Sequence, residues 1–374
     1  MVNRERLINI FFQLVQIDSE SKEERQVADF LKKRLRFLGF HVYEDEAGKK
    51  IGAGAGNIIA RKKGNQAKLP LLFSAHMDTV SPGKGVKPQI RDEIIYSDGT
   101  TILGGDDKAG IAAILEALEV VQEKQLSHGD LEIVFTVAEE IGLLGAKNLN
   151  FDQLKAKLGF ILDSGGSPGT IIVQAPYHQN LKIKIRGKAA HSGVNPEDGI
   201  NAIQVAALVL ARLPLGRIDE ETTANFGVIK GGRASNIIPD YVELDGEIRS
   251  LNPNKMEKAL ELYKEIFEQV TAEQGAHLEW QNELEYSGFS LTEGDQVVAI
   301  AVQAACSLGI PFQLKSRGGG SDANIFNNEG GIPSVNLGVG LTKDHTLEEC
   351  IQVKDLLTTA QYLVEIINTA GETK

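Results

Sequence analysis

Three apolar runs in the first half of the chain each end on acidic or histidine residues, and together they constrain the fold strongly. The runs are LPLLFSAHMD (69–78), DLEIVFTVAEE (130–140) and LGFILD (158–163). Unbroken apolar runs are typical of strands covered on both faces, which occur in parallel sheets. A long helical pattern, KAGIAAILEALEVVQEKQ (108–125), separates the first run from the second. This order predicts an α/β fold with a doubly wound, mainly parallel sheet and helices on both faces.

The middle of the chain has a different pattern. QNLKIKIRGK (179–188) alternates apolar and polar residues, which is typical of a strand in a sheet with one face open to solvent. The segments that follow complete the order strand, helix, strand, strand, helix, strand, which is the ferredoxin-like plan. We therefore predict an inserted α+β domain over residues 177–290 and a discontinuous first domain made of residues 1–176 and 291–374.

Two helices are predicted before the first strand. Apolar residues between Leu7 and Val15 recur at helical spacing without a small-residue cleavage site, which indicates an amphipathic helix and not a signal peptide. Ser21 and Glu24 have the spacing of a capping box. This spacing predicts a second helix that starts there and runs to Gly39.

Composition limits the class of partner. The net charge of −12 disfavours nucleic acid and anionic membranes, because both select basic surfaces. The two cysteines, Cys306 and Cys350, form no CxxC motif, so we expect a reducing compartment and a cytoplasmic location. No apolar run approaches the length that a membrane-spanning helix needs.

His76 and Asp78 end the first apolar run, two residues apart. Side chains at i and i+2 of a strand share one face and lie about 6.5–7 Å apart along the backbone. The carboxylate can then hold one imidazole nitrogen and leave the other for a metal. The alternative is a buried strand that happens to end in polar residues, and an H-x-D motif by itself does not decide between the two.

Four more segments place similar residues at the ends of strands or the start of a helix. They contain Asp106 with Asp107, Glu139 with Glu140, Asp163, and His345. Each has a plain structural explanation, since aspartate caps helices and acids complement the dipole of a helix N-terminus. Five such places in one α/β chain are harder to explain in that way. Their histidines and carboxylates suit a pair of borderline divalent metals.

These segments, with others in the inserted domain, resemble the motifs of the co-catalytic zinc metallopeptidase clan that holds peptidase T, the aminoacylases and related carboxypeptidases. The matching segments are HMD (76–78), GGDDK (104–108), AEEIGLLGA (138–146), Asp163, AAHSGVNPEDGINAI (189–203), GGRASNIIPD (231–240), RGGGSDANIF (317–326) and DHTLEE (344–349). They keep the family order and span nearly the whole chain. GDDKAG and AEEIGLLGA are most similar to the peptidase T branch.

The resemblance implies a role for each residue of the first domain. His76 and Asp163 would bind one Zn²⁺, Glu140 and His345 would bind a second, and Asp106 would bridge the two. Asp78 would orient His76, and Glu139 would act as the general base. Asp107 would then be a helix cap or a neighbour of the ligands. Mn²⁺ or Co²⁺ in place of one or both Zn²⁺ ions is equally compatible with these residues.

The resemblance also implies roles in the inserted domain and in the segment RGGGSD. In dimeric family members the histidine that matches His191 reaches the partner's active site and helps to stabilise the oxyanion. Asn236 and Arg249 resemble substrate-binding residues, and Gly319 and Gly320 would offer backbone groups to the substrate. We therefore expect the inserted domain to serve as a lid and to form a homodimer.

The expected function is hydrolysis of small peptides, with a tripeptide-type aminopeptidase as the first choice. A carboxypeptidase or an N-acyl amino acid amidohydrolase of the same clan is the alternative. A serine hydrolase is a rival from another class, because GGSPG (165–169) fits G-x-S-x-G, but a strand pattern follows it where a helix is required. The segment GAGAG (52–56) precedes a strand and therefore lacks the context of a dinucleotide site.

Overall fold

The computed structural model describes residues 1–370 and divides the chain into two compact units. The first unit contains Met1–Val173, Ser290–Ser316 and the chain from Ser321 onward. The second contains Gln174–Phe289 and the short segment Arg317–Gly320. The second unit therefore includes seven residues outside the predicted range of 177–290, namely 174–176 and 317–320, and it ends at Phe289, one residue before the predicted boundary.

The first unit is built on a nine-stranded sheet, as predicted for an α/β fold. Its path runs β1 (His41–Glu44), β2 (Ile58–Lys62), β6 (Leu131–Thr136), β3 (Leu71–His76), β7 (Leu158–Ser164), β16 (Ser334–Gly338), β8 (Thr170–Ala175) and β14 (Phe289–Ser290), with β15 (Gln313–Ser316) beside β8. Strands β6, β3, β7 and β16 are parallel to one another. Strands β1, β2 and β8 add antiparallel pairs toward the two edges. The doubly wound, mainly parallel sheet is thus confirmed.

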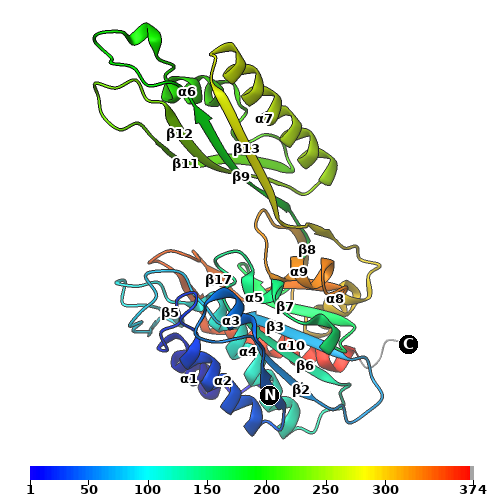
Figure 1. Ribbon diagram of the computed structural model, residues 1–374. Helices are drawn as coiled ribbons and strands as arrows, with labels where there is room; N and C mark the ends of the chain where they lie inside the picture. The colour runs from blue at the N-terminus through cyan, green and yellow to red at the C-terminus, as the bar shows by residue number, and fades with distance from the viewer. Residues whose placement is uncertain (371–374) are drawn as a thin grey trace. The chain divides into compact units, whose positions relative to one another are not determined.

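Helices pack against this sheet in two groups. Contacts join α1 (Arg4–Val15), α4 (Gly105–Glu123), α8 (Gln296–Leu308) and α10 (Val353–Thr369) to one another, and they join α3 (Ala47–Ile51), α5 (Leu144–Lys147) and α9 (Asp322–Asn328) in a second group. Helix α4 packs against strands β3 and β7, and α10 packs against α4 (Figure 1). Among the described residues, no helix is long and apolar enough to cross a membrane.

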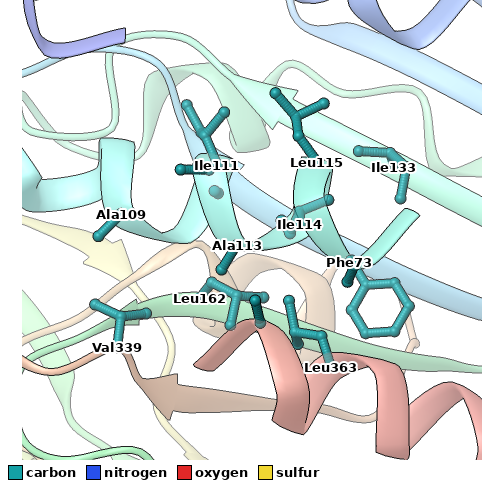
Figure 2. Packing of buried hydrophobic residues seen from close by; sticks show 14 of the residues in the cluster. Phe73, Ala109, Ile111, Ala113, Ile114, Leu115, Ile133, Leu162, Val339 and Leu363 are labelled. Carbon is teal, nitrogen blue, oxygen red and sulfur yellow. The ribbon is translucent and has the colours of Figure 1, made fainter. Parts of the chain in front are cut away.

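Alternation along the central strands assigns their side chains to two faces. Phe73, Ile133 and Leu162 belong to the main apolar core with α4 and α10 (Figure 2). Each apolar side chain of this size contributes about 1.5–3 kcal/mol when fully buried. Because side chains of a strand alternate, His76 and Asp163 lie on the opposite face from that core. Packing in the core therefore holds strands β3 and β7 in place, and these strands carry His76 and Asp163 near their carboxyl ends.

The predicted capping box is wrong. Helix α2 spans Arg25–Phe37 and begins after Glu24, and no side chain caps it. The Ser21 hydroxyl instead donates to Asp78 Oδ2 at 2.7 Å, and Glu24 Oε1 accepts the backbone N–H of Ala138 at 3.0 Å. Glu24 Oε1 also accepts the nearby N–H of Lys22 at 2.8 Å, but neither Ser21 nor Glu24 makes the bonds of a capping box.

A small sheet of four strands supports the loop that carries His345. Its order is β17 (Leu341–Thr342), β18 (Cys350–Gln352), β5 (Ile94–Tyr96) and β4 (Gln89–Arg91). Strands β17 and β18 are antiparallel, with Thr342 opposite Cys350, so residues 343–349 form the connecting loop of a hairpin. These strands are too short to show as apolar runs in the sequence.

The second unit has its own antiparallel sheet in the order β10 (Gly216–Arg217), β11 (Thr222–Gly231), β12 (Tyr241–Ser250), β9 (Tyr177–Arg186) and β13 (His277–Tyr286). Helices α6 (Ala202–Arg212) and α7 (Pro253–Glu273) pack on it (Figure 1). Leu181, Ile183 and Ile185 of β9 are buried in this unit's core, whereas the residues between them are more exposed. Apart from the two-residue edge strand β10, the order of strands and helices is that of the predicted ferredoxin-like plan.

Candidate metal centre and active site

The candidate metal residues of the first unit lie at the carboxyl ends of its parallel strands. His76 is the last residue of β3, Asp163 is next to last in β7, and the turn with Glu139 and Glu140 follows β6. Because parallel strands end at one edge of a sheet, these residues share that edge. Asp106 reaches it from the start of α4, and His345 from the hairpin loop between β17 and β18.

Asp106 lies between two imidazoles. Its Oδ1 is 3.0 Å from His76 Nε2, and its Oδ2 is 3.2 Å from His345 Nε2. The same nitrogen of His345 is 3.0 Å from Glu140 Oε1. One carboxylate thus presents a different oxygen to each histidine, which is the arrangement expected of a bridging ligand.

The donor set fits divalent metals of the zinc type. One ligand atom from each of His76, Asp106 and Glu140 lies within 4.8 Å of the others, so the three side chains form a candidate metal site. Imidazole and carboxylate ligands bind Zn²⁺ at about 2.0–2.2 Å, which places two tetrahedral ligands roughly 3.3–3.5 Å apart. The observed contacts of 3.0–3.2 Å are close to that spacing. Among the described residues, Asp163 and His345 lie outside this mutually close trio.

Asp163 is buried and its backbone is fixed by one partner. Its N–H donates to Asn336 Oδ1 at 3.0 Å, and its carbonyl accepts from Asn336 Nδ2 at 2.6 Å. The negative charge of Asp163 also helps to raise the pKa of Glu139 and of Asp107. These effects place its carboxylate among the acids of the site.

The two histidines are held by carboxylates. Hydrogen bonds to Asp106 and Glu140 raise the pKa of His345 to about 10. Burial opposes a charge on His76, but hydrogen bonds to Asp106 and Asp78 prevail and raise its pKa well above the usual range. The concentration of negative charge around both rings is therefore large, and cations of any kind would be attracted to it.

Asp78 organises more than one neighbour. His76 Nδ1 lies 3.3 Å from Asp78 Oδ1 and 3.0 Å from the Asp78 carbonyl. The carboxylate of Asp78 also accepts the N–H groups of Glu139 at 3.0 Å and Glu140 at 3.2 Å, besides the Ser21 hydroxyl. Asp78 thus connects the ring of His76 to the turn that carries both glutamates, a link that its spacing from His76 did not suggest.

Asp107 and Lys108 support the same region from the start of α4. Asp107 Oδ1 accepts the N–H of Gly110 at 3.1 Å, as a helix cap does, and Oδ2 accepts the N–H of His76 at 3.3 Å. Lys108 is buried, and its ammonium donates to the Asp78 carbonyl at 3.4 Å. Burial lowers the pKa of Lys108. The peptide bond between Asp106 and Asp107 is cis.

Glu139 is buried beside other acids. Burial is the main cause that raises its pKa well above the usual range, and the charge of Asp163 adds to it. Asp322, which accepts from the Thr136 hydroxyl, is a further acid nearby, and burial raises its pKa to about 6. A raised pKa makes a carboxyl group hold a proton more readily, as a group that takes up and returns a proton requires.

Sequence reasoning missed several residues that hold the site. They are Ser21, Glu24, Lys108, Thr136, Asp322 and Glu349. Lys108, Asp322 and Glu349 lie inside quoted motifs, so their position was a usable signal. Glu349 is buried, and burial raises its pKa to about 7.

In the second unit, the structure brings His191 and Asn236 together. His191 pairs with Ile237 in an isolated antiparallel bridge, and the Ser192 N–H donates to the Asn236 carbonyl at 3.1 Å. His191 is exposed, and its Nδ1 accepts the N–H of Gly193 at 3.2 Å. These two segments therefore form one exposed loop region.

A second group in this unit joins Arg249 to the glycine segment. Glu247 accepts from Arg249 Nε at 3.2 Å and from Nη2 at 3.0 Å, and Arg249 Nη1 donates to the Tyr286 hydroxyl at 3.3 Å. That hydroxyl also accepts the N–H of Gly320 at 3.0 Å. The N–H of Gly320 is therefore already engaged. A Cβ added at Gly319 would have its nearest contact beyond the neighbouring residues with Arg317 Nε, at 3.8 Å.

The serine-hydrolase rival lacks its structural context. GGSPG connects β7 to β8, and β8 begins at Thr170 directly after it. A nucleophile elbow needs a helix at this place.

Known proteins are similar to this chain over its whole length. Peptidase T of Escherichia coli is 28% identical over 421 residues, which cover 99% of this chain and 100% of the relative. The crystal structure of aminopeptidase PepT from Bacillus cereus has 46% identity and a TM-score of 0.93, and the match covers 99% of this chain and 100% of that one. A tripeptidase structure from Staphylococcus aureus has 43% identity and a TM-score of 0.96, and both chains are covered completely. The model of peptidase family M20/M25/M40 matches residues 72–369, so the chain belongs to this family of peptidases.

Proposed function

We propose that this peptidase is a di-metal aminopeptidase that hydrolyses small peptides of the tripeptide type. The observation that carries the proposal is the carboxylate of Asp106 between His76 and His345, with one oxygen toward each ring. The similar proteins described as an aminopeptidase and as a tripeptidase support the choice of substrate. Two Zn²⁺ ions, or Mn²⁺ or Co²⁺ in their place, are the proposed cofactors.

The proposed ligands divide into two sets that share Asp106. His76 and Asp163 would complete the first position, and Glu140 and His345 the second. When bound, two such ions polarise the scissile carbonyl and acidify the attacking water. The residues of the chain hold the ligands in place: Asp78 fixes the ring of His76 and the turn with Glu140.

Glu139 is the proposed general base. Its side chain would take a proton from the attacking water and pass it to the leaving amine. Its backbone N–H is fixed by Asp78 at 3.0 Å, so the carboxylate starts from a held position. Its adjacent neighbour Glu140 contacts His345, which gives the two glutamates different surroundings.

The second unit supplies the proposed substrate contacts. His191 would help to stabilise the oxyanion, and Asn236, Arg249, Gly319 and Gly320 would bind the substrate. For Gly320 the contribution would come from its carbonyl, since its N–H is donated to Tyr286. The roles of this unit as a lid and in a homodimer are part of the same proposal, as is a cytoplasmic location, which rests on two free cysteines.

The alternative within the family is a carboxypeptidase or an N-acyl amino acid amidohydrolase. One observation favours it: Arg249 is held in a fixed orientation by Glu247 and Tyr286. A fixed guanidinium suits recognition of a free substrate carboxylate. A tripeptidase could bind the substrate carboxylate in the same way. The two functions are therefore distinguished by whether the enzyme requires a free amine on its substrate.

The test is a substrate panel with the purified protein. Tripeptides, dipeptides and the same tripeptides with an acetylated amine are assayed before and after removal of metal with a chelator. We expect hydrolysis of the free tripeptide from its amino end, loss of activity on chelation and recovery with Zn²⁺, Mn²⁺ or Co²⁺. Preference for the acetylated peptides would support the alternative. Activity that resists chelation and yields to phenylmethylsulfonyl fluoride would contradict the metal mechanism.

A further inference from the structure

Glu349 connects two loops that carry proposed ligands. It lies four residues after His345 and directly before β18, and its side chain is 1% exposed. Its Oε2 accepts the N–H of Gly104 at 2.8 Å, and its Oε1 accepts the N–H of Asp106 at 3.0 Å. The hairpin loop is thereby tied to the turn that presents Asp106, although the two are more than 240 residues apart in the sequence.

The same two segments fit closely at a second point. A Cβ built on Gly105 would lie 2.4 Å from Leu341 Cδ2 and 3.1 Å from Glu349 Oε1. Leu341 belongs to β17, the other strand of the hairpin. The turn at residues 104–106 therefore packs against the hairpin at a glycine and bonds to it through a buried carboxylate.

The other proposed ligands are anchored elsewhere. His76 and Asp163 lie in fully buried strands, and the N–H of Glu140 is held by Asp78. Of the five proposed ligands, only Asp106 and His345 lie on segments that Glu349 joins. Both of them are ligands of the proposed second metal position, whose third ligand is Glu140. At the first position only Asp106 depends on Glu349.

We propose that Glu349 is a positioning residue that sets Asp106 against the His345 loop, so that the second metal position has its full affinity only while Glu349 accepts both N–H groups. The inference rests on the proposed metal function. It predicts that a substitution of Glu349 weakens metal binding at the second position more than at the first. A residue that merely stabilises the fold would have no such preference.

The test is Glu349→Gln in the full chain, with Glu348→Gln as the matched control. An amide has one oxygen, so its NH₂ group would face one of the two backbone N–H donors and leave it unpaired. Glu348 is exposed and pairs with Lys343, so its substitution removes the same charge without touching the turn. Metal binding to the stripped proteins is measured by calorimetry with Zn²⁺, together with the melting temperature with and without metal.

Wild type and Glu348→Gln should bind two ions per chain. Glu349→Gln should bind the first with nearly unchanged affinity and the second at least about tenfold more weakly, as for other partners of metal ligands. The rise in its melting temperature when a second equivalent of Zn²⁺ is added should be smaller than in wild type. Equal losses of melting temperature with and without metal, at unchanged affinities, would overturn the inference. If wild type itself bound no metal, the proposed function would fail instead.

A second variant covers the case in which Glu349→Gln does not fold. Gly105→Ala leaves every charge in place but inserts a methyl group where Leu341 and Glu349 lie. It should show the same selective weakening of the second ion. Two ions bound by Gly105→Ala with wild-type affinities would contradict the role assigned to this contact.

Discussion

The two units hold their predicted functional side chains in different ways. In the first unit His76, Asp78, Asp106, Glu139 and Asp163 are all buried, and bonds to side chains or backbone surround them, whereas Glu140 is half-buried and His345 lies on an exposed loop. In the second unit His191 and Asn236 lie on an exposed loop region, and Arg249 is half-buried on a strand. Buried polar groups must find partners within the protein, whereas exposed ones can use water.

This difference separates two kinds of substitution. A change in the first unit alters a network whose members depend on one another, because one group such as Asp78 contacts His76, Glu139 and Ser21 at once. A change in the second unit removes a contact from a scaffold whose core lies elsewhere. We therefore expect larger losses in turnover for the first unit and changes in substrate affinity for the proposed substrate-binding residues of the second, whereas His191 would act on turnover through the oxyanion.

The largest effect is expected for Glu139→Gln. The amide keeps the size of the side chain but cannot accept the proton, so kcat should fall by about 10²–10⁴-fold. Metal content should stay at the wild-type level, since the proposed ligand is the adjacent residue. Glu140→Gln is the matched control and should lose metal. Assays of kcat and metal content on both variants check this, and loss of metal by Glu139→Gln would show that the two roles are exchanged or shared.

A smaller effect is expected for Asp78→Asn. The amide places an NH₂ group where the Ser21 hydroxyl and the N–H groups of Glu139 and Glu140 now donate, so at least one donor loses its acceptor. Loss of such an orienting partner typically costs about 10–100-fold in activity or metal affinity. We expect kcat/KM to fall within that range and by more than the metal content. Ser21→Ala, which removes one bond from the same network, should cost less. Equal effects of the two variants would argue against Asp78 as the organising residue.

The positions of the site residues at the strand ends were predictable, because parallel strands end at the same edge of a sheet. Apolar runs identify β3, β6 and β7, and parallel pairing then brings His76, Glu139 and Asp163 to one edge without any knowledge of the family. The place of His345 was not predictable in that way. Its hairpin has strands of two and three residues, so only the resemblance connected it with Asp106.

Local patterns failed where distant partners compete for the same groups. Ser21 and Glu24 have capping-box spacing, yet their side chains bond to Asp78 and to the N–H of Ala138. Glu348 and Glu349 are neighbours of one type, but one pairs with Lys343 at the surface and the other is buried against the turn at Asp106. Spacing alone does not contain the tertiary contact that decides between such outcomes.

The smallest effect is expected in the second unit, for Arg249→Lys. Lysine keeps the charge but loses the planar fork that contacts Glu247 and Tyr286, so it would present a less fixed cation to a substrate carboxylate. We expect KM for a tripeptide to rise roughly tenfold with kcat little changed, the sign of lost uniform binding. Arg186→Lys on β9 of the same sheet is the matched control, because Arg186 is exposed and pairs with Glu279. If Arg249→Lys behaved like this control, the proposed carboxylate contact would be wrong. If it lowered kcat as much as Glu139→Gln, the expectation that Arg249 of the second unit affects substrate affinity and not turnover would be wrong.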